Sequence, residues 1–162
     1  MNTFALAFLG GIVGAVLMDI TETAMARVGI RSGVNVALVG RWFLGLMRGR
    51  VAHANIQASP ARQREAGLGW AFHLLIGGGA VALVYPMVLL LLDLHLPPLL
   101  SGLLFGLATS ALPWLVLLPA FGWGWFGRRG PRGANALLAS PLAHIPYGIG
   151  VGAVMAMGSG FR

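Results

Sequence analysis

The sequence predicts an all-α integral membrane protein, a four-transmembrane-helix bundle with an interfacial or re-entrant helix in its first cytoplasmic loop. Apolar residues make up 57% of the 162 residues and charged residues only 9%, whereas a soluble domain carries about 25% charged residues. Four apolar stretches are long enough to cross a bilayer. The arginines gather in alternate connections between these stretches, as the positive-inside rule expects. The length fits a single domain, 1–162.

The charge balance is strongly basic, because all 11 basic residues are arginines and the net charge is +7. Such a balance can indicate a nucleic-acid partner. Here the arginines lie between apolar segments, where they set the orientation of a membrane protein. We therefore expect the lipid bilayer as the partner and no nucleic acid. Cysteine is absent, which excludes disulfides, thiolate metal sites and cysteine nucleophiles.

The first predicted span, about residues 4–26, resembles a signal peptide in its position alone. It lacks a basic start and a small-residue cleavage pattern, and it continues into Asp19 and Glu22. We expect it to be retained as a membrane helix. At 100° per residue, Gly11, Ala15 and Glu22 share one face and Asp19 lies on its flank. The two acids are therefore predicted to point into the bundle.

The first basic connection, residues 27–64, holds seven arginines and is predicted to be cytoplasmic. Its apolar part, residues 34–47, is shorter than the roughly 20 residues that a spanning helix needs. An interfacial or re-entrant helix is the better interpretation, with Trp42 among the lipid headgroups.

Three further spans are predicted at about residues 66–92, 99–121 and 137–157. The third and fourth each carry a GxxxG pair, a pattern that lets membrane helices approach closely. Arginine counts in successive exposed segments are zero, seven, zero, three and one. Four spans with both termini on the non-cytoplasmic side satisfy this alternation.

Four ionisable residues are expected at a comparable depth near the cytoplasmic side. Asp19 and Glu22 lie within two turns of the end of the first span, and His73 and His144 lie about two turns into the second and fourth. A charge at this depth costs roughly 2.5 to 3.5 kcal/mol on insertion scales, so such residues usually pair, bind ions or line water. Carboxylate and imidazole together suit protons or a divalent ion such as zinc, iron(II) or manganese.

We therefore predict a polar site, with a divalent metal ion as the candidate cofactor. The predicted metal ligands are Asp19, His53, His73 and His144, and the second members are Glu22 and Glu65. His53 and Glu65 stand at the two ends of the basic connection and are expected to fold over the site.

Several interpretations stay open at this point. The buried acids and histidines can hydrogen-bond one another or free carbonyls as structural groups. A binding or transport role for a cation or proton ranks narrowly above a structural or assembly subunit, which would be a homo-oligomer or have a membrane partner. A third hypothesis is a membrane-embedded enzyme that acts on a lipid-soluble substrate, with Trp70, Phe72 and Tyr147 at its entrance. No serine lies in a nucleophile-elbow context, so a hydrolase is not supported.

Several fragments resemble the bacterial membrane proteins of the domain-of-unknown-function 2938 family. The matching pieces are Ala15 to Asp19, Asn35, Ala37 to Trp42, His53, Glu65, Gly69, Trp70, His73, Pro119, Gly122, Gly124, His144 and Gly148. The resemblance covers nearly the whole chain and implies a small multi-span inner-membrane protein without an established activity. It supports Asp19, His53, Glu65, His73 and His144 as family positions, whereas Glu22 departs from the pattern. Arg41 is expected to pair with an acid or to anchor to phosphate.

Overall fold

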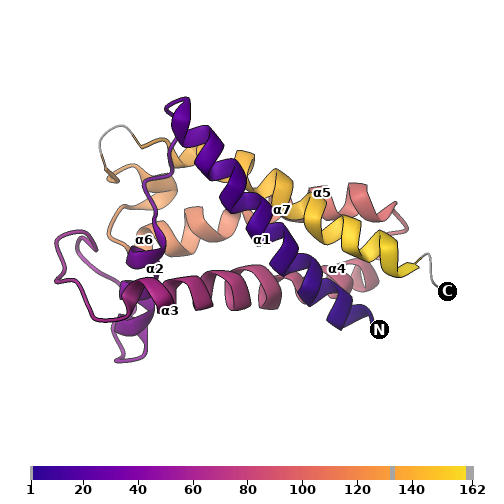
Figure 1. Ribbon diagram of the computed structural model, residues 1–162, viewed down its shortest axis with the longest axis horizontal. Coiled ribbons are helices and arrows are strands. Elements are labelled where there is room, and N and C mark those ends of the chain that lie inside the picture. The colour runs from indigo at the N-terminus through magenta and orange to yellow at the C-terminus, as the bar shows by residue number, and fades with distance from the viewer. Residues whose placement is uncertain (1, 132–133, 160–162) are drawn as a thin grey trace.

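The computed structural model describes residues 2–131 and 134–159, and within them every regular element is a helix (Figure 1). The elements are α1 (Thr3–Arg27), α2 (Val36–Leu46), α3 (Glu65–Ala71), the π-helix η1 (Phe72–Ala80), α4 (Val84–Leu91), α5 (Pro98–Thr109), the π-helix η2 (Pro113–Leu117), α6 (Leu118–Ala120), the 3₁₀-helix η3 (Trp125–Gly127) and α7 (Ala136–Ser159).

Among the described residues, four helices are long and apolar enough to cross a membrane, and the shorter helix α2 is apolar as well. We call the four long helices spans 1 to 4, and they cover Thr3–Arg27, Glu65–Leu91, Pro98–Ala120 and Ala136–Gly158. Span 2 is built from α3, η1 and α4, and span 3 from α5, η2 and α6. The predicted fold class is confirmed.

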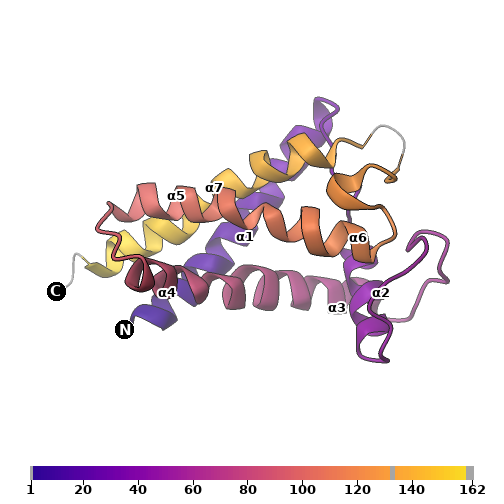
Figure 2. The same ribbon diagram turned by 180° about the vertical axis from the view of Figure 1, so that it is seen from behind.

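The spans pack in the order 2, 1, 4, 3 rather than in chain order. Span 1 packs on span 4 and on η1, and α5 packs on span 4 (Figure 2). Within the described residues the backbones of spans 2 and 3 seldom come close, and the Tyr85 side chain of span 2 reaches Ser101 and Phe105 of span 3. Glycines make these contacts close. A Cβ on Gly102 would lie 2.6 Å from the carbonyl oxygen of Gly148, and one on Gly106 would lie 2.5 Å from that of His144. The GxxxG pairs of spans 3 and 4 therefore face each other.

Two of the spans change to π-helix in their middle. Proline at the first position of η2 has no N–H to donate, and η1 contains the run Gly77 to Gly79, which weakens the regular α-helical pattern. The Tyr147 hydroxyl of span 4 donates a 2.8 Å hydrogen bond to the Gly78 carbonyl. A side chain of one span therefore holds a backbone oxygen of another, as apolar surroundings require. Short π-helical segments are frequent at functional sites.

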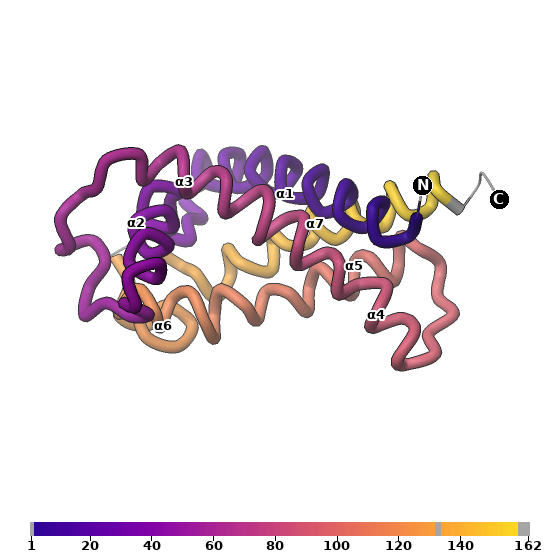
Figure 3. Tube along the Cα trace, turned by 90° about the horizontal axis from the view of Figure 1, so that it is seen from below, coloured from indigo at the N-terminus to yellow at the C-terminus, as the bar shows by residue number. Residues whose placement is uncertain are grey.

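The two ends of the bundle differ in charge. Span 1 begins and span 4 ends at the same end, and the long connections lie at the opposite one (Figure 3). The described arginines all lie in or beside these connections: Arg27, Arg31, Arg41, Arg48, Arg50, Arg62, Arg64, Arg128 and Arg129. We call this the arginine-rich end. Such an asymmetry is what the positive-inside rule uses to orient a membrane protein.

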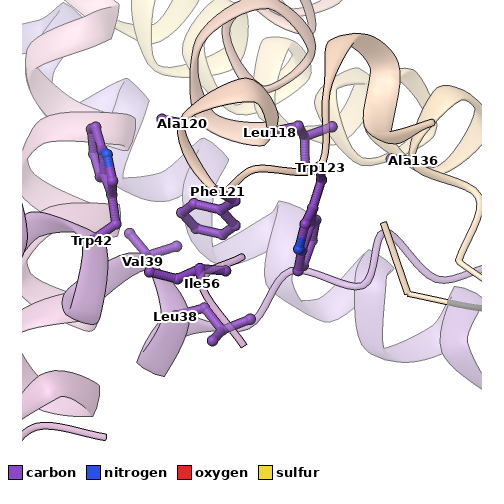
Figure 4. Close-up of a cluster of buried hydrophobic side chains, with 9 residues drawn as sticks. All are labelled: Leu38, Val39, Trp42, Ile56, Leu118, Ala120, Phe121, Trp123 and Ala136. Carbon is purple, nitrogen blue, oxygen red and sulfur yellow. The ribbon is translucent and has the colours of Figure 1, made fainter. Parts of the chain in front are cut away.

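A compact apolar core stabilises the arginine-rich end (Figure 4). It brings α2 together with the segment after it and with α6: Leu38, Val39, Trp42, Ile56, Leu118, Ala120, Phe121, Trp123 and Ala136. Backbone hydrogen bonds from His53 to Ala120 (2.8 Å) and from Ile56 to Phe121 (2.9 Å) hold the segment after α2 against span 3. This end is therefore a folded cap on the bundle rather than a loose loop.

Candidate functional site

A cavity of about 280 Å³ lies where α1, η1, η2 and α7 come together beneath the cap. Most of its wall is apolar, but Asp19, Glu22, His73 and His144 all line it. We call it the polar cavity. Most of the site predicted from sequence is therefore brought to one place.

The polar cavity opens between spans 2 and 3. Three of its lining residues, Ile76, Leu112 and Val116, are 47%, 45% and 53% exposed. Exposed apolar side chains on spanning helices face lipid. The cavity is therefore accessible sideways from the hydrocarbon region.

Asp19 and His73 form the closest charged contact in the polar cavity. His73 Nε2 lies 3.0 Å from Asp19 Oδ1, and the two side chains are 22% and 27% exposed. The distance suits an ion pair, yet Nε2 has no hydrogen bond of acceptable direction and is buried. A hydrogen bond weakens steeply when its angle is poor, so the short distance alone does not make one. The pair is therefore in contact without being saturated.

His144 faces the same cavity in a defined tautomer. Its Nδ1 lies 2.8 Å from the Ser140 carbonyl oxygen, one helical turn earlier. A carbonyl only accepts, so Nδ1 carries the proton, and in the neutral ring Nε2 is a free acceptor. His144 can therefore accept a proton or bind a cation through Nε2.

The ionisable side chains that line the polar cavity are acids and histidines. Asp19 and Glu22 supply two carboxylates, and none of the described arginines is among the lining residues. With these carboxylates ionised, the cavity would favour a cation over an anion.

Ser140 is a member of the site that the sequence did not single out. It is 6% exposed, it lines the polar cavity, and its hydroxyl has no hydrogen-bond partner. A buried polar group without a partner is costly, and ordered water or a bound ligand is the usual explanation. The residue carries no charge and sits in a common small-residue context, so no sequence signal pointed to it.

Glu65 and Arg41 form a second charged pair away from the polar cavity. The guanidinium donates from Nε and Nη2 to both carboxylate oxygens at 2.9 and 2.8 Å, and from Nη1 to the carbonyls of Ile56 and Ser59. The backbone N–H of Arg62 also donates to Glu65. Hydrogen bonding to Glu65 raises the pKa of Arg41 above its ordinary value. We call this pair saturated, because its polar groups are occupied by each other and by backbone groups. Arg41 is thus paired with an acid, as expected from the sequence.

Two glycines explain why Arg41 and Glu65 meet. A Cβ on Gly40 would collide with the carbonyl of Glu65, and one on Gly69 would collide with that of Val36. The backbones of α2 and α3 therefore touch, which brings the neighbouring side chains together. Neither Arg41 nor Glu65 lines the polar cavity.

His53 lies in the cap and not at the polar cavity. Its Nδ1 is 3.1 Å from the Ser59 hydroxyl, which in turn donates to the Asn55 carbonyl. The hydroxyl proton is thus used, so His53 Nδ1 is the donor. Burial, with help from Arg50, Arg62 and Arg41, lowers the pKa of His53 below its usual range.

The predicted metal ligands are thus divided between two places. Asp19, His73 and His144 share the polar cavity with Glu22, whereas His53 and Glu65 belong to the cap. In the part of the chain that the structure describes, no three histidine, aspartate or glutamate side chains form a group that could hold a metal ion. The metal ligand set stays a prediction.

The fold and the site define a multi-span membrane protein whose helical bundle encloses a carboxylate and imidazole cavity. The chain belongs to the family described as "Protein of unknown function (DUF2938)", whose model matches residues 8–157. The resemblance found in the sequence is thereby confirmed over nearly the whole chain. No curated protein and no solved structure matches this chain.

Proposed function

We propose that this protein binds a proton or cation in the polar cavity and moves it across a bacterial inner membrane. The arginine-rich end would face the cytoplasm and both termini the opposite side, by the positive-inside rule. One observation carries the proposal: Asp19 and His73 are 3.0 Å apart without an aligned hydrogen bond, in a cavity that also holds Glu22 and His144. Membrane acids that are not locked in structural pairs commonly mark ion or proton pathways.

The chemistry follows from the charges. With His73 neutral, two carboxylates lie in a mostly apolar cavity, and a proton or cation lowers the cost of keeping them there. Imidazole can both accept and release a proton, which suits His73 to exchanging that proton. His144 Nε2 supplies a second acceptor in the same cavity.

A proton-flux measurement tests this role. Protein in liposomes loaded with a pH-sensitive dye is driven by a potassium diffusion potential. Wild type should acidify the lumen at least about tenfold faster than empty liposomes, and Asp19→Asn and His73→Gln should abolish the excess. Equal flux in wild type and Asp19→Asn would contradict the proposal.

The chain provides its own matched controls. Asp93 and His95 form an exposed pair 3.7 Å apart in the connection between spans 2 and 3. Asp93→Asn and His95→Gln make the same chemical changes outside the membrane core and should leave the flux unchanged.

The divalent-metal form of the proposal is separable by metal analysis. Purified wild type would carry a stoichiometric metal ion that His73→Ala and His144→Ala lose. An absence of metal in protein that still conducts protons would reject the metal form and keep the proton form.

A further inference from the structure

A second cavity adjoins the polar cavity on the side away from the cap. It has a volume of about 490 Å³ and lies between α4 and α5. We call it the apolar cavity. Its hydroxyl groups are occupied, because Tyr85 and Ser101 bond each other at 2.8 Å and Thr109 donates to the Gly106 carbonyl at 2.7 Å. What it offers to a ligand is therefore hydrocarbon surface.

The two cavities adjoin each other and share part of their walls. Val81, Thr109 and Leu112 line both of them. The backbones of spans 2 and 3 seldom come close in the described residues, and the Tyr85 side chain bridges them at Ser101. Volumes of about 280 and 490 Å³ are comparable with the roughly 300 to 1,000 Å³ of small-molecule sites. Taken together, the two cavities are polar at the end near the cap and apolar along the rest.

The charges at the polar end select the headgroup. The described residues that line the polar cavity include two acids, Asp19 and Glu22, and two histidines, and they include no arginine. Arg41 of α2, the helix whose Val39 and Trp42 line the polar cavity, is bound by Glu65 and two carbonyls. A phosphate or carboxylate headgroup would meet carboxylates with no arginine to pair with, whereas a cationic headgroup would be complementary.

Unpartnered polar groups at the same end point independently to a ligand. The buried Ser140 hydroxyl lines the polar cavity without a partner, and His73 Nε2 has no aligned hydrogen bond. Both lie at the end where the headgroup would sit. The lipid-exposed Ile76, Leu112 and Val116 at the opening provide an apolar entry route between spans 2 and 3.

We propose that the adjoining cavities bind a single-chain amphiphilic organic cation of the alkylammonium class, which enters sideways from the bilayer. The ammonium head lies at Asp19 and His73, and the alkyl chain lies in the apolar cavity. This inference rests on the proposed function, since it names the cation that the polar cavity accepts.

Binding to protein in lipid nanodiscs tests the ligand class, with empty nanodiscs subtracted. The probes are dodecyltrimethylammonium, which has head and chain, tetramethylammonium, which has the head alone, and dodecyl sulfate, which has the same chain on an anion. We expect saturable binding of dodecyltrimethylammonium at least about tenfold tighter than of tetramethylammonium, and no saturable binding of dodecyl sulfate.

Two pairs of variants locate the probe. Asp19→Asn should weaken dodecyltrimethylammonium at least about tenfold, and its control Asp93→Asn should not. Ala111→Phe places a ring in the apolar cavity and should weaken the long-chain probe while leaving tetramethylammonium unchanged. Its control is Ala24→Phe, at an exposed residue that lines neither cavity. Thermal unfolding of each variant confirms that it is folded.

The outcomes separate this inference from the proposed function. Equal affinity for the long-chain and head-only probes, or saturable binding of dodecyl sulfate, overturns the ligand class. If proton flux still depends on Asp19, the proposed function survives that result. Loss of the Asp19 dependence from both binding and flux overturns both proposals.

Discussion

Two acid–base pairs of this molecule, one in the cap and one in the polar cavity, differ in how fully their hydrogen-bonding groups are used. Arg41 and Glu65 form a two-pronged ion pair at 2.8 and 2.9 Å, with further bonds to carbonyls. Asp19 and His73 approach to 3.0 Å but lack an aligned hydrogen bond and line a cavity. The hydrogen-bonding groups of Arg41 and Glu65 are occupied by each other and by carbonyls, whereas Asp19 and His73 keep groups that a ligand can bind. The comparison teaches that saturation, and not the presence of charge, separates a structural pair from a candidate site.

The largest expected effect is on the saturated pair. Arg41→Ala leaves the Glu65 carboxylate, whose side chain is 13% exposed, without its partner and should cost roughly 3 to 5 kcal/mol of unfolding free energy. Thermal unfolding followed by tryptophan fluorescence measures this. Arg48→Ala, at an exposed arginine of the same connection, is the control and should cost less than about 0.5 kcal/mol. A similar cost for both variants would remove the distinction between the pairs.

The next largest effect tests the close packing of spans 3 and 4 that positions His144. A Cβ at Gly106 would lie 2.5 Å from the His144 carbonyl oxygen, so Gly106→Ala must push spans 3 and 4 apart and should cost about 1 to 3 kcal/mol. The same change at Gly67 meets nothing within 4 Å and should be neutral or stabilising. Unfolding of both variants in mild detergent gives the comparison. An unchanged unfolding free energy in Gly106→Ala would mean that spans 3 and 4 are not tightly packed beside His144.

A smaller effect concerns pH at the cap. Because the pKa of His53 is lowered by burial and by three arginines, the folded state favours the neutral ring. This contribution to stability is fully present above the ordinary pKa of about 6.5 and is lost as pH falls toward the lowered folded value. The difference in melting temperature between wild type and His53→Gln should therefore shift against wild type on acidification. A difference that does not change with pH would contradict the assignment.

The smallest effect on stability is expected at the unsaturated pair. Asp19→Asn replaces a carboxyl group that has no aligned hydrogen bond from His73, so we expect the unfolding free energy to change by less than about 1 kcal/mol in either direction. Unfolding beside the matched Asp93→Asn variant checks this. A loss as large as that of Arg41→Ala would show that Asp19 is a structural acid.

Much of the fold was predictable because it depends on local signals. Apolar length and arginine placement identified four spans and the short helix α2. The π-helical segments η1 and η2 were not predicted, since an apolar run has the same composition in either helix type. The two adjoining cavities were also missed, because they depend on how far apart the backbones of spans 2 and 3 lie, and no local pattern encodes that distance.

The candidate site was predictable in part for a similar reason. Asp19, His73 and His144 lie at similar helical depths, and depth can be read from position in a span. His53 and Glu65 could not be placed, because the segment after α2 packs on Ala120 and Phe121 through long-range hydrogen bonds. Ser140 became visible only through its unpartnered hydroxyl.

Labelling with dicyclohexylcarbodiimide tests the central contrast most directly. This lipid-soluble reagent reacts with protonated carboxyl groups that it can reach from the bilayer, and mass spectrometry identifies the modified residue. The account predicts that Asp19, which lines a cavity open between spans 2 and 3, is labelled, and that Glu65, held by Arg41 and Arg62, is not. Labelling of Glu65 with Asp19 left unmodified would contradict it.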